Sequence, residues 1–280
     1  MNMKVDLCGV TLNNPVMTAS GTFGSGAEYA EFVDLNKLGA VVTKGVANVP
    51  WPGNPTPRVA EVYGGMLNAV GLQNPGIDLF VERDIPFLKQ FDTKIMVNVC
   101  GHSTEEYIEV VERLRDQPVD LLEINISCPN VKEGGIAFGQ DPKAVEAITK
   151  EMKKHAAQPV IMKLSPNVTD ITEMARAAEA GGADGLSLIN TITGMKIDIN
   201  RQKFVLANKT GGMSGPAIHP VAVRMVYQTA QAVRLPIVGM GGIMNAEDAI
   251  EMILAGATAV SVGTANFTNP HVTEEIVAGI

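Results

Sequence analysis

The feature that most constrains the fold of this chain is a series of eight short, β-branched apolar runs separated by longer amphipathic stretches. Each run is apolar throughout instead of alternating between apolar and polar residues, which is typical of parallel strands covered on both faces. The pattern therefore predicts an α/β protein with a parallel sheet. The runs begin at Pro15, Ala40, Lys94, Leu121, Pro159, Gly185, Pro236 and Ala259.

Most of the segments between these runs carry helix signals. In STEEYIEVVERLRD, Ser103 is a candidate N-cap and Glu106 follows it by three residues, which is the capping-box pattern. In NAEDAIEMILAGA, Asn245 is the expected cap and the helix is expected to end at Gly256. Strands and helices therefore alternate along the chain.

Eight strands separated by helices in 280 residues fit a (β/α)8 TIM barrel better than an open, doubly wound sheet. The open sheet would call for GxGxxG after the first strand, but SGTFGSG from Ser20 has a different spacing and contains bulky Phe23. We expect a single domain over residues 1–280, because no linker, repeat or low-complexity segment interrupts the pattern. The last helix is expected to be short or truncated, since the sequence stops at Ile280.

Composition excludes several classes of function. Apolar residues make up 46% and charged residues 19%, as in an ordinary globular enzyme. The net charge of −8 lacks the basic field that nucleic acids or anionic membranes require. No run approaches the roughly 18 apolar residues of a membrane helix, and the N-terminus has no apolar stretch of secretory length. We therefore expect a cytoplasmic protein that binds neither nucleic acid nor membrane.

Three cysteines, Cys8, Cys100 and Cys128, lie far apart in the sequence and form no CxxC pair. This spacing predicts neither a disulfide framework nor a metal site. Taken alone, each cysteine is most simply a small buried side chain. Cys128 differs because Pro129 and Asn130 follow it, which indicates a loop instead of a core run.

Two connections are longer than a compact domain usually needs. Residues 46–76 are rich in Pro and Gly, and residues 191–217 are rich in Gly, Thr and Lys. Loops of this length are usually lids or binding loops. We therefore expect both segments to cover a site.

Polar residues follow the strongly apolar runs at the strand ends, where the chemistry of this fold is located. Asn and Ser can stand there simply because they tolerate turns, and Lys can extend to the rim. A lysine enclosed by VVT and G, or by VIM and L, has little room to do so, which favours a functional role. The residues at these ends are Ser20, Lys44, Asn98, Asn125, Cys128, Lys163, Asn190 and Thr191.

The last two strands end in glycine, at Gly241-Gly242 and at Gly263-Thr264. Such turns let backbone N–H groups approach a ligand phosphate where these barrels commonly bind one, although tight helix–strand packing would also select glycine. A phosphate cradle, a lysine and several amides suit flavin mononucleotide (FMN), in which a lysine near the N1–C2 edge stabilises the anionic reduced ring. The spacing alone is also compatible with a phosphosugar isomerase or aldolase.

Several motifs, taken together, resemble the dihydroorotate dehydrogenase family, and they cover nearly the whole chain in the expected order. They are SGTFG at Ser20, TKG at Thr43, TPRVAE with GGMLNAVGLQNPG at Gly64, INISCPNVKEGGIAFGQD at Ile124, MKLSPNVTD at Met162, LINT at Leu188, GGMSGPAIHPVAV at Gly211 and GMGGI at Gly239. In this family a serine replaces the catalytic cysteine in the membrane-linked class 2, so Cys128 implies class 1. The NAVGLQNPG and CPNVKEGG segments are similar to class 1B, whose catalytic subunit pairs with an electron-transfer subunit.

The resemblance implies a role for each matching residue. Cys128 would be the base that removes the C5 proton of dihydroorotate, from a loop that can close over the substrate. FMN would contact Ser20, Lys44, Gly45, Asn98, Asn125, Lys163, Ile189, Gly215, Gly241, Gly242, Gly263 and Thr264. The substrate would contact Lys44, Asn68, Ala69, Val70, Gly71, Leu72, Asn125, Asn190 and Thr191.

The resemblance also implies partners. A homodimer of this chain would associate with a subunit carrying FAD and a 2Fe–2S cluster to form a heterotetramer that reduces NAD. The alternatives are a fumarate-dependent class 1A enzyme, an FMN barrel like that of dihydropyrimidine dehydrogenase, a phosphosugar lyase or isomerase, and a non-catalytic interaction subunit.

Overall fold

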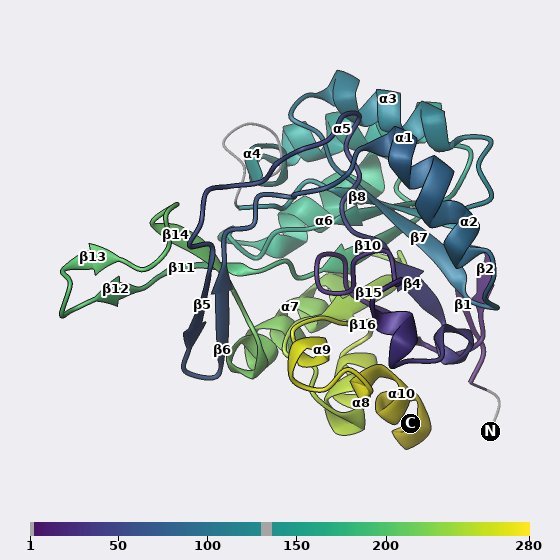
Figure 1. The fold of residues 1–280 in the computed structure, drawn as a ribbon. Helices are drawn as coiled ribbons and strands as arrows, with labels where there is room; N and C mark the ends of the chain where they lie inside the picture. Colours follow the sequence, from purple (N-terminus) through teal and green to yellow (C-terminus); the bar gives the residue numbers. More distant parts are fainter. Residues whose placement is uncertain (1–2, 130–135) are drawn as a thin grey trace.

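The computed structural model describes residues 3–129 and 136–280 of the chain (Figure 1). Eight parallel strands close into a barrel in the order β10-β15-β16-β3-β4-β7-β8-β9. They are β3 (Val16–Thr18), β4 (Ala40–Val42), β7 (Lys94–Val99), β8 (Leu121–Asn125), β9 (Val160–Lys163), β10 (Gly185–Leu188), β15 (Ile237–Met240) and β16 (Ala259–Val262). Each lies in one of the eight apolar runs, so the prediction of a (β/α)8 barrel is confirmed.

Helices surround the barrel (Figure 1). They are α1 (Ile77–Leu79), α2 (Ile85–Leu88), α3 (Thr104–Leu114), α4 (Ile136–Gly139), α5 (Pro142–His155), α6 (Ile171–Ala180), α7 (His219–Ala232), α8 (Ala246–Leu254), α9 (Ala265–Thr268) and α10 (Val272–Gly279), and a π-helical turn (Phe80–Asp84) joins α1 to α2. Between β3 and β4 the described chain forms two 3₁₀ turns, Tyr29–Glu31 and Leu35–Lys37, in place of an α-helix. The eight-residue α10 packs beside β3 and is tied to the second turn by an ion pair between Lys37 and Glu274, 3.1 Å long. None of the described helices is both long and apolar enough to cross a membrane.

The predicted helix caps are present. The Ser103 hydroxyl accepts a hydrogen bond from Glu106 N at 3.4 Å, while the Glu106 carboxylate accepts from His102 N at 2.7 Å. The Asn245 side chain accepts from Asp248 N at 3.0 Å. The helix that it caps ends at Leu254, two residues before the expected Gly256, whose φ of +115° turns the chain.

Side chains of the barrel strands alternate between two apolar layers. In β7, Ile95, Val97 and Val99 belong to the outer core beneath the helices, whereas Met96 packs inside the barrel. The inner layer is closed from the N-terminal end by the hairpin of β1 (Val5–Leu7) and β2 (Val10–Leu12), whose Leu7 and Leu12 are fully buried against it. The lower barrel is therefore packed core.

The two long connections form β-structure instead of the predicted loops. Segment 46–76 contributes β5 (Val59–Val62) and β6 (Gly65–Asn68), and segment 191–217 contributes β11 (Ile192–Met195) and β14 (Thr210–Ser214). The four strands form one sheet in the order β11-β14-β6-β5, and a small hairpin of β12 (Ile197–Asp198) and β13 (Lys203–Phe204) projects beyond it (Figure 1). The prediction of loops was wrong here. The pairing of β6 with β14 joins distant segments and leaves no local sequence pattern, while β5 and β6 form a local hairpin inside a segment whose Pro and Gly content indicated a loop.

Candidate active site

A cavity opens at the C-terminal ends of the barrel strands, and the four-stranded sheet β11-β14-β6-β5, called the accessory sheet below, lies along one side of it. Its empty volume is about 1190 Å³, counting the part that is open to solvent. It is lined by residues at the ends of the barrel strands, such as Ser20 and Lys163, and by residues of the accessory sheet, such as Met66.

The structure brings almost all of the predicted site residues into this cavity. Its lining includes Cys128, Ser20, Lys44, Gly45, Asn98, Asn125, Lys163, Ile189, Gly215, Gly241, Gly242, Gly263, Thr264, Asn68, Val70, Gly71, Leu72, Asn190 and Thr191. Ala69 is the exception, since its side chain is fully buried with Leu67 and Leu206 in a small apolar cluster. Successive side chains of an extended segment point to opposite sides, so Asn68 and Val70 face the cavity and Ala69 does not.

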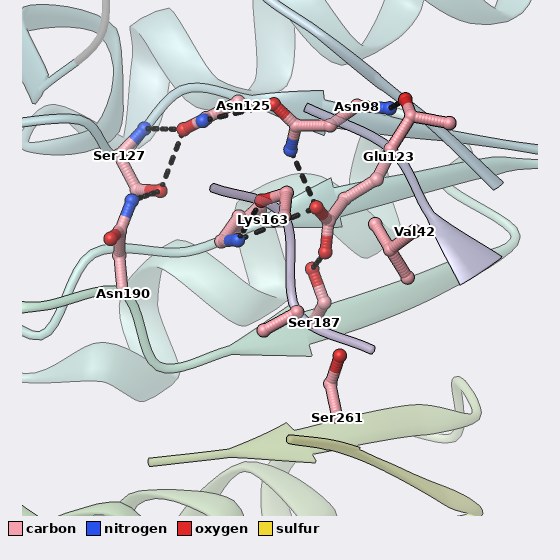
Figure 2. A network of polar contacts seen from close by, with 12 residues as sticks. Val42, Asn98, Glu123, Asn125, Ser127, Lys163, Ser187, Asn190 and Ser261 are labelled. Atoms are coloured by element: carbon pink, nitrogen blue, oxygen red, sulfur yellow. Dashed lines mark hydrogen bonds and ion pairs between the residues drawn. The ribbon is translucent and has the colours of Figure 1, made fainter. Parts of the chain in front are cut away.

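The floor of the cavity is a network of buried polar side chains centred on Glu123 (Figure 2). Glu123 Oε2 accepts from Asn98 Nδ2 at 2.5 Å and lies 3.4 Å from Lys163 Nζ. Glu123 Oε1 accepts from the Ser187 hydroxyl at 2.7 Å, and Lys163 Nζ also donates to Ser20 Oγ at 2.9 Å. The Glu123 carboxylate on β8 therefore links directly to β7, β9 and β10, and through Lys163 to the segment after β3.

A second branch runs from Asn98 to the rim (Figure 2). Asn98 Oδ1 accepts from Asn125 Nδ2 at 3.2 Å, and Asn125 Oδ1 accepts from the Ser127 hydroxyl at 3.1 Å. The same hydroxyl accepts from Asn190 Nδ2 at 2.8 Å. The branch also receives support from outside the barrel, where Tyr107 donates to Asn125 O at 2.6 Å.

Strand register creates this network. In the parallel ladders Asn98 stands beside Glu123, Asn125 beside Lys163, and Lys163 beside Ser187. Side chains at neighbouring positions on one face of a sheet are close enough to interact. A shift of one residue would turn these side chains toward the outer helices, so the barrel core that fixes the register also fixes the site.

Lys44 follows β4 and lines the cavity beside the two cysteines Cys100 and Cys128. Burial lowers the pKa of the Lys44 ammonium below its usual value, and attraction to the sulfurs of Cys128 and Cys100 acts in the opposite direction. The positive charge of Lys44 is therefore balanced less well than that of Lys163, which faces the Glu123 carboxylate. An anionic ligand in the cavity would supply the missing compensation.

The three cysteines have different positions. Cys128 lies three residues after the end of β8, is 6% exposed and lines the cavity. Cys8 lies at the opposite end of the barrel, where its thiol donates to Asp184 O, and burial together with the Asp184 carboxylate raises its pKa to about 12. Burial also raises the pKa of Cys100. Residues 130–135, where a loop that closes over the substrate was expected, lie outside the described residues.

The glycines of the last two strand ends serve different purposes. Gly241 and Gly242 have φ of +131° and +67°, and an added Cβ would lie 2.7 Å from Ala222 Cβ and from Gly215 O respectively. Backbone conformation and packing thus already demand glycine at both positions. At Gly263 an added Cβ would meet only ordinary contacts, the nearest being Ala19 Cβ at 3.5 Å. Packing within the described chain gives no reason for this glycine, whereas a ligand that approached the backbone here would.

Sequence reasoning missed Glu123 and His219. Glu123 was visible as a single acidic residue inside the apolar run LLEINIS, where an unpaired carboxylate would be costly. His219 begins α7, and its Nδ1 lies 2.8 Å from Gly241 O, so the imidazole braces the glycine turn. Its Nε2 and the carboxylates of Asp248 and Glu251 lie within 4.8 Å of one another and could hold a cation, but a 3.1 Å contact between Nε2 and Glu251 already accounts for the arrangement.

Comparisons with known proteins agree with this geometry. The family model described as dihydroorotate dehydrogenase matches residues 2–280. The chain is 74% identical to a protein of Lachnoclostridium phytofermentans, with 100% of this chain and 93% of the relative covered, and 67% identical with the same coverage to one of Alkaliphilus metalliredigens. A protein of Geotalea uraniireducens is 55% identical, over 100% of this chain and 92% of the relative. All three are named dihydroorotate dehydrogenase B (NAD(+)), catalytic subunit. This chain therefore belongs to the dihydroorotate dehydrogenase family of oxidoreductases.

Proposed function

We propose that this chain is the FMN-bearing catalytic subunit of a class 1B dihydroorotate dehydrogenase, which oxidises (S)-dihydroorotate to orotate in pyrimidine biosynthesis. The observation that carries the proposal is the convergence of Cys128, Lys44 and Lys163 with the Gly263 turn in one cavity. The names of the relatives support the same substrate.

The residues that line the cavity fit FMN. Backbone N–H groups around Gly242 and Gly263 would hold the phosphate, and Gly263 is the position where packing gives no other reason for a missing Cβ. Lys163 and the amides of Asn98 and Asn125 would contact the ring. When bound, FMN supplies the acceptor for the hydride that leaves substrate C6.

Cys128 is the proposed base. Its sulfur would accept the proton from substrate C5 on the side opposite the flavin. A free thiol ionises near a pKa of about 8.5, so the rate should rise with pH until the thiolate has formed. Lys44 lies beside Cys128 in the cavity.

Polar side chains would select the substrate. Orotate carries a carboxylate, ring carbonyls and ring N–H groups, and each needs a partner when it is buried. Asn68, Asn190, Thr191 and Lys44 line the cavity and provide amide, hydroxyl and ammonium groups for them. A substrate that lacks the carboxylate, such as dihydrouracil, would leave the charge of Lys44 without an anion.

The partner is part of the proposal. The relatives are named as catalytic subunits, which implies that they work with another chain. We infer a homodimer that binds an electron-transfer subunit carrying FAD and a 2Fe–2S cluster, with NAD as the final acceptor and the cytoplasm as its location.

The test begins with the purified chain. We expect a yellow protein that absorbs at about 450 nm, is bleached by dihydroorotate under anaerobic conditions and is not bleached by dihydrouracil. A colourless protein that cannot be reconstituted with FMN would contradict the proposed cofactor. Co-purification from the native source should yield an FAD and iron–sulfur protein, and fumarate-dependent turnover without such a partner would contradict class 1B.

A further inference from the structure

Glu123 is the most deeply buried carboxylate in the cavity floor, with a relative exposure of 1%. It projects into the barrel above the apolar layer that contains Leu121 and Ile161. A carboxylate in such a place is strongly unfavourable unless it is paired and hydrogen-bonded. Packing alone therefore does not account for a glutamate at this position, and its polar contacts must.

The contacts of Glu123 satisfy both of its oxygens. Oε1 accepts from Ser187 at 2.7 Å, and Oε2 accepts from Asn98 at 2.5 Å and lies 3.4 Å from Lys163 Nζ. An ammonium has three donors. Ser20 and Glu123 account for two of those of Lys163 among the described residues, and both partners hold the lysine where it lines the cavity.

The carboxylate also gives the amide branch a direction. An ionised carboxylate can only accept hydrogen bonds, so Asn98 must turn its Nδ2 toward Glu123 and its Oδ1 toward Asn125. Asn125 then donates to Asn98 and accepts from Ser127, and Ser127 accepts from Asn190. Every donor in this branch points toward Glu123 (Figure 2).

We propose that Glu123 is a positioning residue, whose carboxylate anchors Lys163 in the cavity floor and sets the direction of the hydrogen bonds from Asn98 to Asn190. Glu123 lies beneath the cavity and is not among the residues that line it. Its negative charge offsets the positive charge of Lys163 just below the proposed flavin site, and so it tunes how easily the flavin is reduced. This inference rests on the proposed function, because it takes FMN to be the group that Lys163 faces.

The test compares Glu123→Gln with Ser187→Ala by spectroelectrochemical titration of bound FMN at pH 6, far below the usual lysine pKa of about 10.4. Gln keeps the shape of Glu123 but removes the charge, so the ratio of reduced to oxidised flavin at a fixed potential should rise about tenfold. For a two-electron couple that is about +30 mV in midpoint potential. Ser187→Ala removes one hydrogen bond and leaves the charge, so its midpoint should equal that of the wild type.

An unchanged midpoint in Glu123→Gln would overturn the inference. If Glu123→Gln fails to fold, the double variant Glu123→Gln/Lys163→Met decides, because removing one member of a buried ion pair is more harmful than replacing both. Recovery of folding in the double variant supports the pairing, whereas failure of both shows that Glu123 serves the fold alone. Loss of FMN from the wild type would instead contradict the proposed function, which the visible spectrum of the unmodified protein reports separately.

Discussion

At the scale of single residues, the two lysines of the cavity differ in how their charge is balanced. Lys163 is 3% exposed and faces the Glu123 carboxylate. Lys44 has the sulfurs of Cys128 and Cys100 as favourable neighbours, and burial lowers its pKa. The protein thus holds one compensated cation, and one cation that an anionic ligand would stabilise.

This difference predicts the effect of Lys44→Met on stability. Because the pKa of Lys44 is lower in the folded state, the unfolded state binds more protons between that lowered value and the ordinary lysine value, and stability rises with pH across that window. Below this pH window Lys44 is charged in both states, and the folded protein bears the full cost of burying that charge. Lys44→Met without ligands should therefore be more stable than the wild type at pH 7, with a smaller rise in stability toward pH 10. Urea unfolding at several pH values measures both, and parallel curves for the two proteins would contradict the prediction.

Cys128→Ala should retain FMN but lose most turnover, by a factor of about 10²–10⁴, because the base is gone. Cys128→Ser should keep slight activity at high pH. Cys8→Ala is the matched control, since Cys8 lies at the far end of the barrel, and it should turn over normally. Steady-state rates at pH 7 with an artificial acceptor measure the effect, and normal turnover of Cys128→Ala would remove the cysteine from the mechanism.

At the scale of elements, the pairing of β6 with β14 joins the two halves of the accessory sheet, β5-β6 and β11-β14. The two strands approach closely at Gly65, where an added Cβ would lie 1.9 Å from Ser214 O. The same pairing places Asn68 beside Gly212 and leaves Asn68 and Thr191 in the cavity lining. The proposed substrate contacts of Asn68 and Thr191 therefore depend on a strand pairing outside the barrel.

Gly65→Ala should separate β6 from β14 without breaking any barrel ladder. We expect a rise in KM for dihydroorotate larger than the fall in kcat, with bound FMN retained. Gly194→Ala in β11 is the control, because its Cβ would meet Leu67 Cδ2 at 3.1 Å, a side-chain end that can move by a few tenths of an ångström. Equal KM values for Gly65→Ala and the wild type would show that the accessory sheet does not position the substrate residues.

At the scale of the whole molecule, the barrel interior has two parts. The N-terminal part is an apolar core closed by the β1-β2 hairpin, and the C-terminal part is the polar floor of the cavity. Leu7 and Leu12 of the hairpin close the lower half, far from the cavity lining. Leu12→Ala should lower the free energy of unfolding by about 2–5 kcal/mol, as measured in urea, with no change in the flavin spectrum. The neighbouring exposed Thr11→Ala should change stability by less than about 0.5 kcal/mol. A spectral change in Leu12→Ala would show that the two halves are coupled.

The sequence by itself determined the barrel and most of its mouth. Runs such as LLEINIS and VIMK predict strands from their local composition alone. Lys44, Asn125 and Lys163 stand at the ends of such runs, and this position predicted that they line the site. Parallel strands in sequence order then carry these residues to the same end of the barrel.

Only the tertiary structure decided which side chains of each run point inward, what Glu123 pairs with, and that segments 46–76 and 191–217 share a sheet. Runs that are apolar on both faces carry no period that separates inside from outside. Partners such as Glu123 with Lys163, or Asn68 with Gly212, are set by register between distant strands, and register is a property of the packed barrel and not of any local stretch of chain.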